Sequence, residues 1–76
     1  MKAFVLVSLK NGNEKEVLKE VKKLPSVKNA FILFGEWDLL LETESSSSEE
    51  LGTFVMDQLR AHPNVRLTSS LIVAGK

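Results

Sequence analysis

The sequence predicts an α+β protein of the ferredoxin-like βαββαβ type, in which a four-stranded antiparallel sheet carries two helices on one face. Four short apolar segments of strand character are interrupted by two amphipathic helical segments. The two halves form a faint repeat, because Pro25 and Pro63 are as far apart as Val17 and Val55. Two βαβ units with matching helices imply two right-handed crossovers onto one sheet, whose first and third strands are central.

Composition restricts the protein to a small class. Its 76 residues make one domain, spanning residues 1–76, and contain no cysteine for a disulfide or a thiolate metal site. Ten basic and ten acidic residues give a net charge of zero, a poor basis for binding nucleic acid directly. No apolar run approaches the roughly 20 residues of a membrane span. We therefore expect a cytoplasmic protein with neither a nucleic acid nor a membrane as direct partner.

The first half is expected to begin with a strand over Ala3–Leu9, whose apolar residues occupy both faces. Asn13 is expected to cap a helix that runs to about Lys23, with Glu16 as the reciprocal partner in a capping box. Pro25 ends this helix because proline has no N–H to continue it.

A hairpin is expected to follow, with strands over Val27–Phe34 and Trp37–Glu44. Gly35 lies in its short turn and tolerates the positive φ that such a turn requires. Apolar residues fill Ala30–Phe34, and three leucines follow the turn without alternation. Both faces of the hairpin therefore need cover.

The second helix is expected to start at a capping box formed by Ser47 and Glu50 and to end before Pro63. A fourth strand is expected over Val65–Val73. The apolar face of this helix consists of Leu51, Phe54, Val55 and Leu59.

The sheet is expected to carry more apolar side chains than two helices can cover. A large apolar side chain left in water forfeits about 1.5–3 kcal/mol of burial energy, and a face with several of them is typical of an interface. We therefore expect two copies to pack sheet to sheet as a dimeric α/β barrel.

Signals for catalysis are weak. The single histidine, His62, is expected to be a polar residue at the end of the second helix. No His/Cys cluster or glycine-rich phosphate loop is present. Acylphosphatase-like chemistry would need an arginine near the loop after the first strand, and Arg60 and Arg66 lie elsewhere in the sequence. We expect no catalytic residue, no cofactor and no metal.

Candidate ligand-binding residues lie at the hairpin turn and in the last strand. Asp38 either accepts hydrogen bonds from its own turn or, with exposed amides, holds the charged ends of a small zwitterion. Trp37 either packs in the core or anchors an interface. Thr68–Ser70 either form the polar side of an edge strand or line a pocket.

Four motifs follow one another in an order that resembles the Lrp/AsnC family, and in particular its C-terminal ligand-binding (RAM) domain. They are Leu24–Val27, Gly35–Asp38, His62–Val65 and Thr68–Val73, and the resemblance covers essentially the whole chain. Full-length members carry an N-terminal helix-turn-helix domain, whereas this chain begins at the first strand. The resemblance therefore implies a stand-alone ligand-sensing module that does not bind DNA itself.

The resemblance also implies dimers that assemble into a ring such as an octamer, with a free amino-acid effector bound between dimers. Such a module would modulate transcription through full-length Lrp/AsnC regulators. Backbone amides near Gly35 would hold the effector's carboxylate, and Asp38 or a carbonyl its ammonium group. The residues that match the family's effector site are Gly35, Glu36, Trp37, Asp38, Gln58, Thr68, Ser69 and Ser70.

The alternative is a small enzyme of the dimeric α/β-barrel type, similar to monooxygenases or isomerases. Such enzymes place a histidine, asparagine or tryptophan deep in a cleft. Trp37 is the only candidate for this role, and His62 is poorly placed for it.

Overall fold

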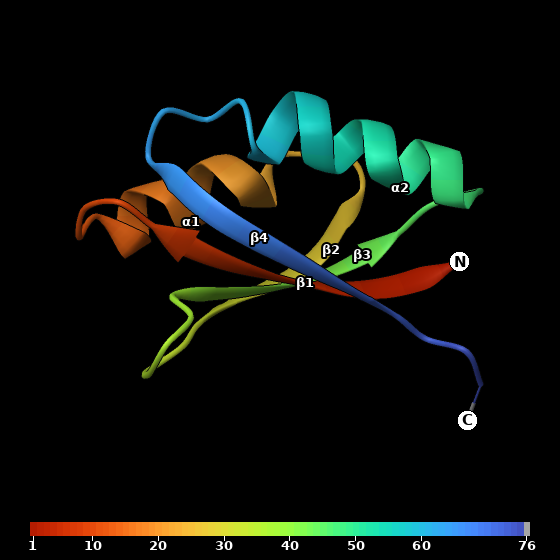
Figure 1. The fold of residues 1–76 in the computed structure, drawn as a ribbon, viewed down its shortest axis with the longest axis horizontal. Helices are drawn as coiled ribbons and strands as arrows, with labels where there is room; N and C mark the ends of the chain where they lie inside the picture. Colours follow the sequence, from red (N-terminus) through yellow and green to blue (C-terminus); the bar gives the residue numbers. More distant parts are fainter. Residues whose placement is uncertain (76) are drawn as a thin grey trace.

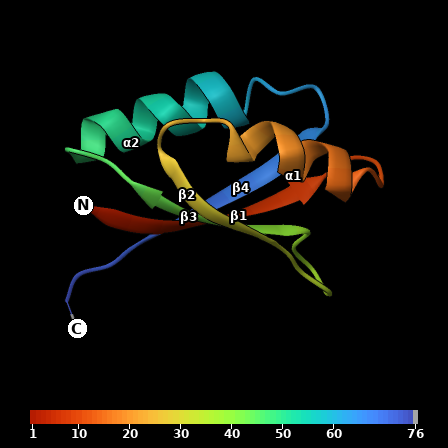
Figure 2. The ribbon, with the colours of Figure 1, turned by 180° about the vertical axis from the view of Figure 1, so that it is seen from behind.

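In a computed structural model that describes residues 1–75, the chain forms a sheet covered on one face by two helices (Figures 1 and 2). The elements follow the predicted βαββαβ order, with one extra helical segment, η1, continuing α2. Their bounds are β1 Lys2–Leu9, α1 Glu14–Lys22, β2 Val27–Ile32, β3 Leu39–Glu44, α2 Ser48–Phe54, η1 Val55–Leu59 and β4 Val65–Ile72.

The four strands are ordered β2-β3-β1-β4, and every neighbouring pair is antiparallel. This confirms the ferredoxin-like fold and the central positions of the first and third strands. Both helices lie on the same side of the sheet, and none of the described residues forms a helix on the opposite side (Figures 1 and 2).

The core lies between the helices and the covered face of the sheet. Alternate residues of the central strands enter it, as the period of a strand requires. The helices contribute the apolar residues spaced along one side of each. The core includes Val5, Val7, Leu39 and Leu41 from the sheet, Val17 and Val21 from α1, and Leu51, Phe54, Val55 and Leu59 from the second helix.

The hairpin differs from the expected one because β2 ends at Ile32 and β3 begins only at Leu39. The six residues between them are outside the ladder, where Leu33 N–H donates to the Asp38 carbonyl at 2.8 Å. Asp38 N–H instead donates to the carbonyl of Val7 on β1, at 2.9 Å. The turn is therefore longer than predicted, although Gly35 has the expected positive φ of 144°.

Of the two predicted N-terminal helix caps, the structure contains only the second. Asn13 makes no side-chain capping bond and has φ 116°, so the predicted capping box with Glu16 is wrong. Ser47 caps α2 as predicted, since its Oγ accepts from Glu50 N–H at 3.1 Å. The Glu50 carboxylate completes the motif one residue earlier than expected, by accepting from Ser46 N–H at 3.3 Å.

The last turns of the second helix are π-helical, which the sequence did not predict. Arg60 N–H donates to the carbonyl of Val55 at 2.8 Å, five residues back. The wider turn accommodates one more residue while Val55 and Leu59 both stay buried. Within residues 1–75, none of the helices has the length and apolar character that crossing a membrane requires.

Candidate functional site

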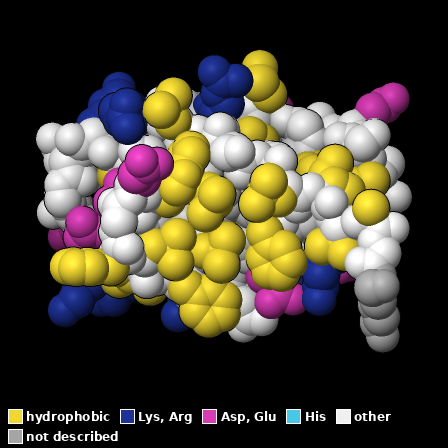
Figure 3. All heavy atoms as spheres, turned by 60° about the horizontal axis from the view of Figure 1, so that its bottom comes forward, with side chains coloured by type: hydrophobic (Ala, Val, Ile, Leu, Met, Phe, Trp, Pro, Cys, Tyr) yellow, Lys and Arg dark blue, Asp and Glu magenta, His cyan; other side chains and the backbone are white. Residues whose placement is uncertain are grey.

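The uncovered face of the sheet carries an apolar patch, visible as a continuous group of hydrophobic side chains in Figure 3. Phe31, Leu67 and Leu71 are about half exposed there. The register places these residues beside others on the same face, since paired residues point to the same side. We define the open-face patch as Phe4, Leu6, Phe31, Leu40, Leu67 and Leu71.

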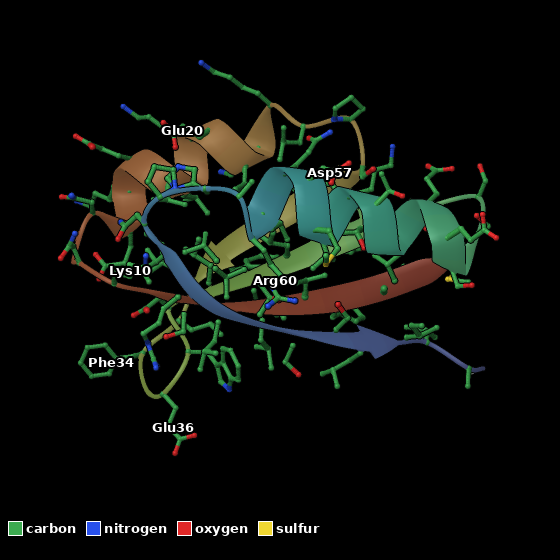
Figure 4. The ribbon with its side chains drawn as sticks, turned by 45° about the horizontal axis from the view of Figure 1, so that its top comes forward. Lys10, Glu20, Phe34, Glu36, Asp57 and Arg60 are labelled. Carbon is green, nitrogen blue, oxygen red and sulfur yellow. The ribbon has the colours of Figure 1, made fainter. Side chains whose placement is uncertain are left out.

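The connection between β2 and β3 projects from the sheet on the side away from the helices (Figure 1). Phe34 extends outward from it and is fully exposed, while Glu36 points away from the sheet at its end (Figure 4). The hairpin therefore borders one end of the open-face patch.

A cleft of about 240 Å³ lies beside this hairpin, and we take it as the candidate ligand site. Glu36 and Trp37 form one side. Ser8, Arg66 and Leu67 form the other side. Guanidinium, hydroxyl and indole groups are thus brought together in a space suited to a small molecule, while the Glu36 side chain points away from the sheet.

Sequence reasoning missed Ser8 and Arg66. Arg66 Nη2 donates to Ser8 Oγ at 3.0 Å, so this arginine does lie at the end of β1. One signal could have found the pair: Ser8 is the only polar residue within the apolar run of the first strand.

A β-bulge in β4 places the Arg66 side chain. Leu9 pairs with Val65 and Ser8 pairs with Leu67, so Arg66 is an extra residue with no partner across the ladder. Val65 faces the helices, so alternation places Arg66 on the open face, and the bulge sets Leu67 on that face as well. The guanidinium consequently reaches Ser8 on the open face.

Asp38 follows Trp37 at the end of the turn, where it ties the hairpin to β1. Its Oδ2 accepts from Leu9 N–H at 2.7 Å. The carboxylate thus has a structural partner, which comes from the neighbouring strand rather than from its own turn. One oxygen is engaged, and the side chain is only partly buried.

The hydroxyl residues of β4 are divided between the two faces of the sheet. Thr68 and Ser70 pair with Val7 and Val5, which face the helices, whereas Ser69 pairs with Leu6 on the open face. Gln58 is exposed on η1, on the helix side. The structure therefore brings Glu36 and Trp37 together in the cleft and places Thr68, Ser70 and Gln58 on the other side of the sheet.

His62 follows the second helix and connects it to α1. Its Nε2 lies 2.5 Å from Oε2 of Glu20 (labelled in Figure 4), and its Nδ1 accepts from Asn64 N–H at 3.1 Å. The proton of the neutral ring is therefore on Nε2, toward Glu20. These contacts give His62 a structural role beside a second hollow of about 220 Å³, which Asn11, Pro63 and Asn64 also line.

Glu42 has a lowered pKa, which has a structural cause. The Asn29 side-chain amide donates to its Oε1 at 2.9 Å and lowers the pKa most, and Lys2 Nζ, 3.2 Å from Oε2, lowers it further. Glu42 pairs with Phe4 and Asn29, away from the cleft. In the described residues no group of three His, Asp or Glu side chains could hold a metal ion.

Comparison with known proteins identifies relatives along nearly the whole chain. Residues 2–75 match the model of the Lrp/AsnC ligand binding domain. An uncharacterised HTH-type transcriptional regulator of Pyrococcus abyssi is 34% identical over 73 residues, which cover 92% of this chain and 49% of the regulator. The chain spans about half the length of the curated relatives it matches.

Solved structures resemble both the fold and the sequence. The protein PHS023 from Pyrococcus horikoshii has a TM-score of 0.89 and 31% identity, covering 99% of this chain and 90% of that one. The transcriptional regulator NMB0573 from Neisseria meningitidis, solved as a complex with L-Met, has a TM-score of 0.88 and 32% identity. That match covers 99% of this chain and 50% of the regulator.

Proposed function

Because the chain belongs to the Lrp/AsnC ligand-binding domain family, we propose that it is a regulatory module that senses a free amino acid. It modulates transcription through Lrp/AsnC-type regulators and makes no contact with DNA itself. The observation that carries this proposal is the cleft beside the hairpin, where Trp37 and Arg66 offer an aromatic face and a guanidinium to a small zwitterion.

Two further observations support an amino acid as the ligand. The Neisseria meningitidis regulator, which shares this fold, was solved with L-Met bound. The cleft of about 240 Å³ is smaller than the roughly 300–1,000 Å³ of sites for drug-sized molecules. The proposed site includes Gly35, Glu36, Trp37 and Asp38 of the hairpin, with Gln58, Thr68, Ser69 and Ser70 as residues that a neighbouring subunit brings to it.

Assembly is the second part of the proposal. Two copies bury their open-face patches against each other, and the dimers join into a ring such as an octamer. Half-exposed Phe31, Leu67 and Leu71 support the pairing, because surfaces of this kind are typical of interfaces. Mixed rings with full-length regulators would transmit the presence of the ligand.

A thermal-shift screen against the twenty amino acids tests the sensing function. A ligand that binds only the folded protein adds about 2.7 kcal/mol of stability at 100 times its Kd. We expect one amino acid, or a few of similar shape, to raise the melting temperature by several degrees. The screen should be repeated at several protein concentrations, so that the oligomer is present in some of them.

If no amino acid raises the melting temperature at any protein concentration, the sensing function is wrong. The proposal also states that this chain makes no contact with DNA. A gel-shift assay of the chain with the operator DNA of an Lrp/AsnC-type regulator tests that statement. Binding of DNA by this chain alone would contradict a purely regulatory module.

A further inference from the structure

We propose that Arg66 is the carboxylate receptor of the cleft and that the site selects an α-amino acid with an apolar side chain. This inference rests on the proposed function and names the class of its ligand. The sequence-based expectation assigned the carboxylate to backbone amides near Gly35 instead.

The strand sets the backbone position of Arg66, whose side chain is exposed and bonded to Ser8. Arg66 is the extra residue of the β-bulge between the Ser8–Leu67 and Leu9–Val65 pairs. Bulges of this kind direct side chains at functional sites. Val65 pairs with Leu9 and faces the helices, so Arg66 lies on the open face, and the bulge leaves both Arg66 and Leu67 opposite Ser8.

Ser8 orients the guanidinium. The residue is only 4% exposed, and its Oγ accepts from Arg66 Nη2 at 3.0 Å. A guanidinium has five N–H donors in a planar fork, so this contact leaves further donors for a ligand. Bidentate binding of a carboxylate is the interaction for which that fork is best suited.

The charge of Arg66 has no protein partner in the described part of the chain. None of the ion pairs among residues 1–75 includes it. The carboxylate of Asp38, the residue after Trp37, accepts from Leu9 N–H. A ligand carboxylate would therefore supply the missing negative charge.

The remaining walls indicate the other end of the ligand. Trp37 and Leu67 give the cleft an apolar surface beside Arg66. The indole face of Trp37 favours a cation and can receive the ammonium group. These groups fit an α-amino acid whose side chain is apolar.

The test compares the full chain with Arg66→Gln in calorimetric titrations with L-methionine, or with the apolar amino acid that gave the largest shift in the screen. Each protein is also titrated with the corresponding amide, which lacks the carboxylate. A charge-assisted hydrogen bond contributes enough that its loss weakens binding by about tenfold or more. We expect the wild-type protein to prefer the acid over the amide by that factor, and Arg66→Gln to lose the preference.

Arg60→Gln is the matched control. Arg60 is an exposed arginine at the end of η1 whose Nη1 lies 3.7 Å from Met56 Sδ, on the helix side (Figure 4). It should bind the acid as the wild-type protein does. Arg66→Lys keeps the charge but not the planar fork and should bind with intermediate affinity. The oligomeric state and melting temperature of each variant are measured without ligand.

The outcomes separate the two proposals. If the wild-type protein binds the acid and the amide equally, Arg66 is not the receptor, although the sensing function stands; this comparison needs no variant and holds even if Arg66→Gln fails to fold. Unchanged acid-over-amide preference in a folded Arg66→Gln also overturns the assignment. If the wild-type protein binds no amino acid, the proposed function fails and the assignment fails with it.

Discussion

Asp38 illustrates how a single residue links the hairpin to the sheet. Its backbone N–H donates to Val7, its carbonyl accepts from Leu33, and its carboxylate accepts from Leu9 N–H at 2.7 Å. The sequence left open whether this carboxylate serves the fold or a ligand. In the structure, the partner of the carboxylate is Leu9 on β1, which is distant from Asp38 in the sequence.

We expect Asp38→Ala to lower the free energy of unfolding by about 1–3 kcal/mol, because it leaves the buried Leu9 amide without an acceptor. Asp38→Asn keeps a side-chain oxygen and should cost less. Urea denaturation of both variants measures the difference. Equal stability of wild type and Asp38→Ala would contradict the structural role, whereas a stable Asp38→Asn that binds ligand poorly would show that the charge also serves binding.

At the scale of the elements, much of the fold could be predicted because it depends on local patterns. Apolar residues at strand and helix periods predicted the order of elements, and Ser47 predicted the start of α2. Asn13 did not behave like Ser47, because its φ of 116° turns its side chain away from the capping position. The length of the turn was missed because Asp38 bonds to β1, a contact across the sheet.

Only part of the candidate site could be predicted. The hairpin residues Glu36 and Trp37 could be proposed from the sequence because polar and amphipathic groups are unusual in an apolar run. Arg66 and Ser8 were missed because a bulge brings them together, and a bulge depends on the register between two strands. The π-helical turn over Val55–Leu59 likewise has no sequence pattern that distinguishes it from an ordinary helix.

Asn13 allows a test of backbone strain at the start of α1. A residue with a Cβ pays about 1–2 kcal/mol in the left-handed region, whereas glycine does not. Since the Asn13 side chain makes no capping bond, Asn13→Gly should raise the free energy of unfolding by up to about 1 kcal/mol, and Asn13→Ala should lower it. Thermal and urea denaturation check both changes. A less stable Asn13→Gly would mean that the side chain has another favourable role.

At the scale of the whole molecule, the two faces of the sheet differ. One face is closed by helices, and the other carries the open-face patch with a projecting hairpin at one end (Figures 1 and 3). A second copy would cover the patch and also enclose the cleft beside Trp37. Assembly and ligand binding would then be coupled through the same surface.

We expect Leu6→Glu to weaken the proposed dimer. Leu6 lies at the middle of the open-face patch, opposite Leu40 and Ser69. A two-fold interface contains each residue twice, so the lost burial of about 1.5–3 kcal/mol per side chain raises the dissociation constant about 100-fold or more. Sedimentation velocity over a range of concentrations measures this change.

Thr53→Glu is the control for that experiment, because Thr53 is exposed on α2 and the same charge is introduced. It should sediment as the wild-type protein does, and circular dichroism should show that both variants are folded. If Leu6→Glu and the wild-type protein sediment identically as monomers, the patch is not a dimer interface.

The bulge at Arg66 has a consequence for how chains of this architecture can diverge. It reverses the alternation along β4, so that Ser69 faces the open side and Thr68 and Ser70 face the helices. In a related chain without the bulge, regular pairing would place Ser69 on the helix side and Thr68 and Ser70 on the open side. Every helix and strand would be kept. A single-residue insertion or deletion near the start of β4 could thus alter ligand preference in one evolutionary step, with the scaffold unchanged.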